Sequence, residues 1–260
     1  MTTRSASLLL LLLTYLASCT QPPKNPPAPG FDEAGSDARA IEIADQVMTA
    51  MGGREAWDNT RLIAWNFFGN RKLIWDKASG QVRVDNLKDD QTVLLNINTD
   101  QGRVFRQGRE LANPDSVARY VKQGKSDWIN DMYWLLMPFK LKDSGLTLKY
   151  AGKDTVADGK LADRLQLTFK GVGDTPGNKY DVWVDQQTHL VSQWAYYPTA
   201  TDKTPGFTLP WSDYQKHGGL LLSGDRGEND LTDIQVFSDL PPEVFTTFTR
   251  PDLTRYAQAN

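Results

Sequence analysis

Two long stretches of the chain alternate apolar and polar residues with a period of two, and this pattern constrains the fold more than any other feature. The first stretch begins near residue 62 and shows a tight-turn signal at Gly69-Asn70. A period of two is typical of strands that bury one face, and turn residues at near-regular spacing predict an antiparallel meander. The apolar positions that share one face in this stretch are Ile63, Trp65, Phe67, Trp75, Val82, Val84, Val93, Leu95 and Ile97.

The same alternation resumes after Gly145 and continues to about residue 237. It predicts a second meander of about six strands. The apolar positions with inward parity there include Leu146, Leu148, Leu165, Leu167, Phe169, Tyr180, Val182, Val184 and Trp194.

Helical periodicity appears before and between the two meanders. Apolar residues recur at helical spacing from Asp37 to Met51, with Ser36 available as a cap and Gly52-Gly53 as a stop. Between the meanders, Asn113-Pro114 is a helix-start signal and Pro138 ends the apolar stripe. The interpretation is a mainly β fold with α. One strongly curved antiparallel sheet, an incomplete barrel, carries an N-terminal helix and a central helical insert.

The N-terminus predicts export and lipid anchoring. Residues 1–18 contain Arg4, a leucine run from Leu8 to Leu13 and small residues before Cys19, which is the layout of a signal peptide. The run is too short to span a bilayer. The quartet ending at Cys19 resembles the lipobox of bacterial lipoproteins, which implies cleavage before Cys19 and acyl chains such as palmitate on it. An ordinary signal peptide with an incidental cysteine is the alternative.

Residues 19–35 are predicted to be the lipidated cysteine and a mobile, proline-rich tether, and residues 36–260 a single globular domain. Cys19 is the single cysteine, so the chain forms no internal disulfide. Thr20, in place of Asp, favours the outer membrane facing the periplasm by analogy with enteric sorting. We therefore expect a lipid-anchored protein of the cell envelope.

Charge and motifs argue against several classes of partner and cofactor. The formal net charge is −3 and no basic run occurs, so nucleic acid is not an expected partner. The glycine-rich residues 171–177 precede a predicted strand rather than a helix, which indicates a hairpin turn and not a phosphate loop. His189 and His217 are the two histidines, too few for a zinc site by themselves. No cofactor and no metal site is expected.

Three segments resemble a known group of envelope proteins. They are GGREAW (residues 52–57), WINDMYWLLMP (residues 128–138) and PWSDY (residues 210–214). Together with the order of the predicted elements, they resemble a family of bacterial lipoproteins beside the LolA/LolB superfamily, over roughly residues 37–248. The resemblance implies an apolar cavity between a curved sheet and its helices that holds acyl chains. The chain has no recognisable counterpart of the membrane-inserting loop of LolB.

Aromatic residues on the inner face give the candidate site. Eight tryptophans are present, and many large aromatics can form either a solid core or the lining of an apolar pocket. Residues 128–138 are predicted to act as a lid over the concave face. The residues assigned to a candidate pocket are Trp65, Phe67, Trp75, Leu95, Trp134, Leu135, Phe169 and Trp194.

The leading hypothesis is a non-enzymatic, membrane-anchored protein that binds a lipid, the acyl chain of a lipoprotein or another apolar ligand. One alternative is an envelope hydrolase that uses His217 with Ser212, Asp213 or Asp225, although no Gly-x-Ser-x-Gly motif occurs. Another is a structural lipoprotein that docks to protein partners whose identity the sequence does not give.

Overall fold

Seven antiparallel strands form the larger sheet of the protein, in the order β14-β1-β2-β3-β4-β5-β6. The computed structural model describes residues 24–256, so the predicted signal peptide and Cys19 lie outside the described residues. The strands of this first sheet are β1 (Leu62–Phe67), β2 (Arg71–Asp76), β3 (Gln81–Asn86), β4 (Gln91–Asn96), β5 (Gln101–Arg106), β6 (Arg109–Glu110) and β14 (Leu231–Phe237). The predicted turn at Gly69-Asn70 joins β1 to β2.

The second meander forms a separate sheet of five antiparallel strands, in the order β11-β10-β9-β8-β7. Its strands are β7 (Leu146–Thr155), β8 (Leu161–Phe169), β9 (Lys179–Asp185), β10 (Val191–Tyr197) and β11 (Phe207–Pro210). A two-stranded hairpin of β12 (Ser212–His217) and β13 (Leu220–Asp225) contacts β14 on one side and β10 on the other.

The predicted fold class is confirmed, because the protein is mainly β with few helices and its large antiparallel sheet is not closed into a barrel. One detail of the prediction is wrong. The two meanders do not share one hydrogen-bonded sheet, since the edge strands β14 and β11 pair only with β1 and β10 among the described strands. Alternation of apolar and polar residues predicts which face of each strand is buried, but it does not predict which strands pair at the edges of a sheet.

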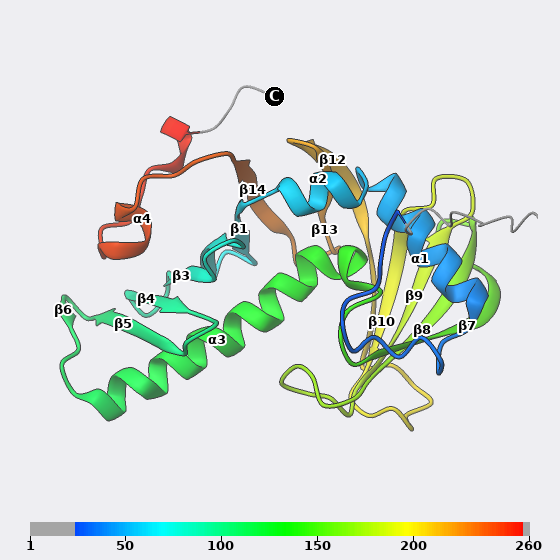
Figure 1. Ribbon diagram of the computed structural model, residues 1–260, viewed down its shortest axis with the longest axis horizontal. Coiled ribbons are helices and arrows are strands. Elements are labelled where there is room, and N and C mark those ends of the chain that lie inside the picture. Colours follow the sequence, from blue (N-terminus) through cyan, green and yellow to red (C-terminus); the bar gives the residue numbers. More distant parts are fainter. Residues whose placement is uncertain (1–23, 257–260) are drawn as a thin grey trace, which may run out of the picture.

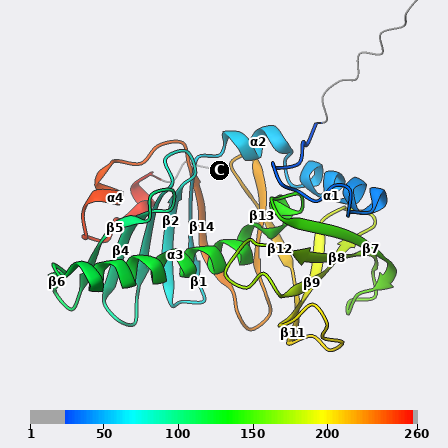
Figure 2. The same cartoon turned by 60° about the horizontal axis from the view of Figure 1, so that its bottom comes forward.

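A single long helix joins the two sheets. Helix α3 (Pro114–Leu136) runs across the inner face of the first sheet and ends against the second half of the molecule (Figure 1, Figure 2). Asn113 caps it by accepting a hydrogen bond from the Ser116 amide at 2.9 Å, as the sequence indicated. A 3-10 turn, η1 (Met137–Lys140), follows at Pro138.

The core lies between the sheets and this helix. Trp65, Leu95, Leu135 and Trp194 are each at most 4% exposed there. Helix α3 lies close against the first sheet at Gly124, where an added Cβ would lie 3.0 Å from the Val93 side chain. The residues predicted to face inward on both sheets therefore pack into one core.

Helices α1 (Ala38–Ala50) and α2 (Arg54–Asn59) lie on the side of the second sheet and the hairpin (Figure 1). Asp37 rather than Ser36 occupies the position before α1. The Ser36 hydroxyl instead donates to the Asp32 carbonyl at 2.6 Å and accepts from the Leu148 amide at 2.9 Å. No helix within residues 24–256 is long and apolar enough to cross a membrane.

The residues that precede α1 are not a free tether in the part that the structure describes. The Ala28 amide donates to the Lys142 carbonyl at 2.9 Å, and the Asp32 amide donates to the Leu146 carbonyl at 3.1 Å. The Asn25 side chain is buried and donates to Asp45 at 2.7 Å. Residues 24–35, which the sequence predicts to be a mobile tether, are therefore hydrogen-bonded to the domain in this structure.

The C-terminal segment covers the outer face of the first sheet, opposite α3 (Figure 1). It contains α4 (Glu243–Thr246) and η2 (Leu253–Tyr256). Arg83, fully buried, pairs with Asp85 at 2.7 Å and donates to the carbonyls of Val244, Thr247 and Phe248. This arginine therefore fixes the segment to β3.

Candidate functional site

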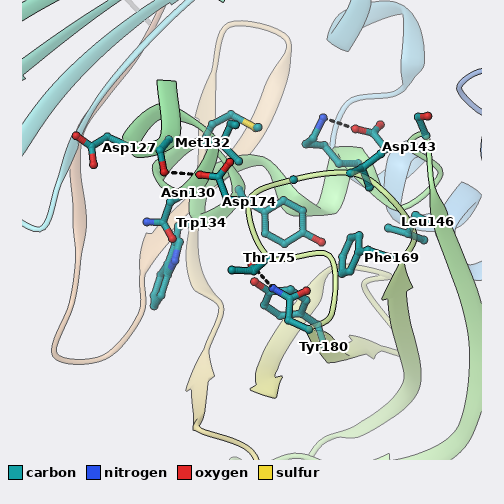
Figure 3. Close-up of a pocket in the computed structure, with 18 of the residues that line it drawn as sticks. Asp127, Asn130, Met132, Trp134, Asp143, Leu146, Phe169, Asp174, Thr175 and Tyr180 are labelled. Atoms are coloured by element: carbon teal, nitrogen blue, oxygen red, sulfur yellow. Dashed lines mark hydrogen bonds and ion pairs between the residues drawn. The ribbon is translucent and has the colours of Figure 1, made fainter. Parts of the chain in front are cut away.

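A cavity of about 550 Å³ opens beside the C-terminal half of α3. Its other walls are the residues between α3 and β7, the ends of β8 and β9, and the loop of residues 170–178 that joins those two strands (Figure 3). The lining residues from α3 and β2 are Arg71, Ser126, Asp127, Ile129, Asn130, Met132, Tyr133 and Trp134. Those from the opposite side are Lys140, Asp143, Ser144, Leu146, Phe169, Val172, Gly173, Asp174, Thr175, Asn178 and Tyr180.

The interior of the cavity is aromatic and aliphatic. The Tyr133 ring lies 5.4 Å from the Tyr180 ring and 6.2 Å from the Phe169 ring, measured between centroids. Burial raises the pKa of the Tyr133 and Tyr180 hydroxyls well above the usual range, so both phenols stay uncharged. Leu146 and Val172 complete this apolar wall. Such a surface binds the apolar part of a ligand.

The rim of the cavity is polar, and its cations already have partners. Arg71 makes two hydrogen bonds of 2.7 Å to the fully buried carboxylate of Asp131, and it lies 4.0 Å from Asp127. Lys140 forms an ion pair with Asp143 (Figure 3). Each of the two positive charges of the lining therefore has a carboxylate partner.

The loop of residues 170–178 closes the cavity opposite α3. The Ser126 hydroxyl of the helix donates to Asp174, and the Asn178 side chain donates to Thr175 at 2.7 Å within the loop. Strands β8 and β9 pair antiparallel on either side of it, so the predicted hairpin turn is confirmed. Among the described residues, Ser126–Asp174 is the one side-chain hydrogen bond between α3 and this loop.

Helix α3 is held by two arginines near the C-terminal end of its cavity face. Arg71 of β2 binds Asp131, and the guanidinium of Arg226 donates to the Trp134 carbonyl at 2.8 Å while it lies 3.5 Å from the Trp211 ring centroid. The helix therefore belongs to the core. The loop of residues 170–178 is the more weakly attached wall.

The eight residues that the sequence analysis assigned to a candidate pocket fall into two groups in the structure. Trp134 and Phe169 line the cavity, and both are half-buried. Trp65, Phe67, Leu95, Leu135 and Trp194 are buried in the packed core, while Trp75 packs edge-on against Trp128 at 5.2 Å. Parity identified the inner face but could not tell packed positions from open ones.

Sequence reasoning missed the loop residues and the polar rim. Val172, Asp174 and Thr175 come from a segment that the pattern identified only as a turn. The two lining tyrosines could have been predicted, because Tyr133 precedes Trp134 in the helix and Tyr180 has the inward parity of β9. No sequence pattern indicated that the loop folds over the helix.

His217 does not form a hydrolase triad with its sequence neighbours. Ser212 and His217 lie at opposite ends of β12, about 16 Å apart at the usual rise per residue. The Ser212 hydroxyl donates to Asp225, and within residues 24–256 His217 makes no hydrogen bond to either side chain. Burial lowers the pKa of His217. Within residues 24–256, no group of three or more histidine, cysteine, aspartate or glutamate side chains could hold a metal ion.

No family model matches the chain, and no curated protein sequence matches it. Among solved structures, it is similar to a DUF1329 family protein from Desulfovibrio piger, with a TM-score of 0.43 and 15% sequence identity over 79% of this chain and 96% of that chain. It is also similar to a LolA superfamily protein from Nitrosomonas europaea, with a TM-score of 0.37 and 12% identity over 80% of this chain and 97% of that chain.

Proposed function

We propose that the protein is a membrane-anchored binding protein that holds a lipid or another apolar ligand in the cavity beside α3. The observation that carries this proposal is the cavity of about 550 Å³ with an aromatic and aliphatic interior and a polar rim. Small-molecule sites have this size and composition, and apolar surface moved from water into such a site gains about 25 cal/mol per Å². The proposed activity is binding rather than catalysis.

Binding is tested with a fluorescent fatty-acid analogue and a cavity-filling variant. Trp134→Asp would place a carboxylate against Phe67 and Trp194, so it would disturb the core as well as the cavity. Val172→Trp is the cleaner variant, because Val172 lies on the loop and the larger tryptophan side chain would fill part of the cavity. The expected result is a loss of probe affinity of at least about tenfold with an unchanged melting temperature.

Leu161→Trp is the matched control, since Leu161 is 59% exposed and is not a lining residue of the cavity. It adds an indole elsewhere on the same sheet and should leave probe affinity unchanged. A wild-type protein that takes up neither this probe nor an uncharged acyl ester would contradict the proposal.

The anchor is the second part of the proposal. Cys19, preceded by the signal-like residues 1–18, would carry the acyl chains that hold the protein to a membrane, with the outer membrane as the proposed destination. Metabolic labelling with a radioactive fatty acid should mark the wild-type protein and not Cys19→Ser. Equal label in both proteins would exclude Cys19 as the lipidated residue.

A further inference from the structure

The volume of the cavity limits how much ligand it can hold. A group the size of a methylene or a water takes about 30 Å³ in a condensed phase, so about 550 Å³ accommodates on the order of 18 such groups. One 16-carbon acyl chain with a glycerol headgroup has about 23 non-hydrogen atoms, which is close to that number. A diacylglycerol with two such chains has about 40, roughly twice that number.

The charges at the rim disfavour an ionised headgroup. Of the charged lining residues, Arg71 and Lys140 are positive, whereas Asp127, Asp143 and Asp174 are negative. Arg71 is further neutralised by Asp131 behind the cavity wall. A carboxylate or phosphate at the rim would therefore meet a surplus of negative charge and two cations that already have partners.

Uncharged hydrogen-bonding groups remain at the rim for a neutral headgroup. Ser144, Thr175 and Asn130 are lining residues, and the last two come from opposite walls (Figure 3). Asn130 donates to Asp131 at 3.0 Å and Thr175 accepts from Asn178 at 2.7 Å, which leaves the side-chain carbonyl of Asn130 as an acceptor and the Thr175 hydroxyl as a donor. Hydroxyl and amide groups exchange hydrogen bonds with alcohols and esters without requiring a counter-ion.

We infer that the cavity selects a lipid with one acyl chain and an uncharged polar headgroup, such as a monoacylglycerol, over a fatty-acid anion and over two-chain lipids. This inference rests on the proposed function and adds the chemical class of its ligand.

The test is a competition assay on the purified Cys19→Ser variant, in which unlabelled lipids displace the bound fluorescent analogue. The competitors are monopalmitoylglycerol, palmitate and dipalmitoylglycerol below their aggregation concentrations. We expect monopalmitoylglycerol to displace the probe at a concentration at least about fivefold lower than palmitate, and dipalmitoylglycerol to displace it poorly.

A charge variant tests the headgroup argument separately from the volume argument. Asp143→Asn removes the carboxylate partner of Lys140 and leaves an unpaired ammonium at the rim. The difference in competing concentration between monopalmitoylglycerol and palmitate should therefore become smaller or change sign. Asp158→Asn is the matched control, because Asp158 pairs with Lys160 at 2.7 Å on the surface and is not a lining residue. The control should keep the wild-type order of competitors.

The outcomes separate the two proposals. If palmitate or dipalmitoylglycerol competes as well as monopalmitoylglycerol, or if Asp143→Asn keeps the wild-type preference, the inference is overturned while the proposed function stands. If the protein binds neither the probe nor any of the three lipids, the proposed function fails, and the inference fails with it.

Discussion

Single arginine side chains connect elements that are far apart in the sequence. Arg71 joins β2 to α3 through Asp131, Arg83 joins β3 to the C-terminal segment, and Arg226 joins the end of β13 to the end of α3. Each guanidinium satisfies several acceptors at once, which a lysine could not do with the same geometry. Arg71 and Arg226 fix the α3 wall of the cavity, and Arg83 fixes the C-terminal segment on the opposite face of the first sheet.

The variant Arg71→Met should destabilise the protein by about 3 kcal/mol, the low end for breaking a buried ion pair, because the Arg71 side chain is 20% exposed. It leaves the buried carboxylate of Asp131 without its cation. Urea denaturation of the two proteins measures the loss in free energy of unfolding. The double variant Arg71→Met/Asp131→Leu should recover most of it, since it removes the stranded charge as well. A single variant within about 0.5 kcal/mol of wild type would contradict this role.

The sequence could not predict these arginine contacts. The alternation of apolar and polar residues predicts that residues such as Ile63 and Leu167 are buried, and both are fully buried. Arg71 stands at the start of a strand and its partner lies 60 residues later. No local pattern relates the two, because their proximity depends on where α3 crosses the sheet.

At the scale of elements, local signals predicted the helices and strands well. The Asn113-Pro114 start and the Pro138 stop of the central helix match α3 and the turn that follows it. The close approach of α3 at Gly124 to Val93, and the fold of residues 170–178 over the helix, are contacts between elements. A period of two or 3.6 carries no information about them.

Loss of the α3 cap should destabilise the whole protein, because this helix contacts both halves of the core. Asn113→Ala removes the acceptor of the Ser116 amide and should lower the free energy of unfolding by about 1 kcal/mol. Thermal or urea denaturation measures the change. Lys122→Ala, an exposed position in the same helix, is the control and should stay within about 0.5 kcal/mol of wild type. Equal stabilities for Asn113→Ala and this control would show that the cap is not needed.

At the scale of the whole molecule, the sequence predicted layers but not their connection. Alternation correctly assigned an inner face to both meanders, and these faces share one core. It could not show that a hairpin of β12 and β13 stands between two sheets, since every edge strand offers the same unpaired backbone groups. The cavity lies where α3 leaves the first sheet, and therefore depends on this division.

The attachment of residues 24–35 also changes the geometry proposed for the anchor. Residues 28–32 run beside residues 142–146, several of which line the cavity. Cys19 precedes the buried Asn25 by six positions, so a fully extended chain between them spans at most about 20 Å. With Cys19 lipidated, as proposed, the fixed part of the domain would stay close to the bilayer from which a lipid ligand would come.

A chain that begins at Ser36 should therefore be less stable than one that begins at Lys24. It loses the hydrogen bonds of Ala28 and Asp32 to the backbone of residues 142–146, and it uncovers Lys142, which is 8% exposed and donates to the Asn25 carbonyl. Each such bond contributes about 1 kcal/mol net, so the melting temperature should fall by about 3–10 °C in circular dichroism. A third chain, in which glycine and serine replace residues 24–35, should melt between the other two, because it keeps the backbone groups that bond to residues 142–146 but loses the Asn25 side chain that donates to Asp45. If all three chains melt together, residues 24–35 contribute nothing to the domain and are a tether after all.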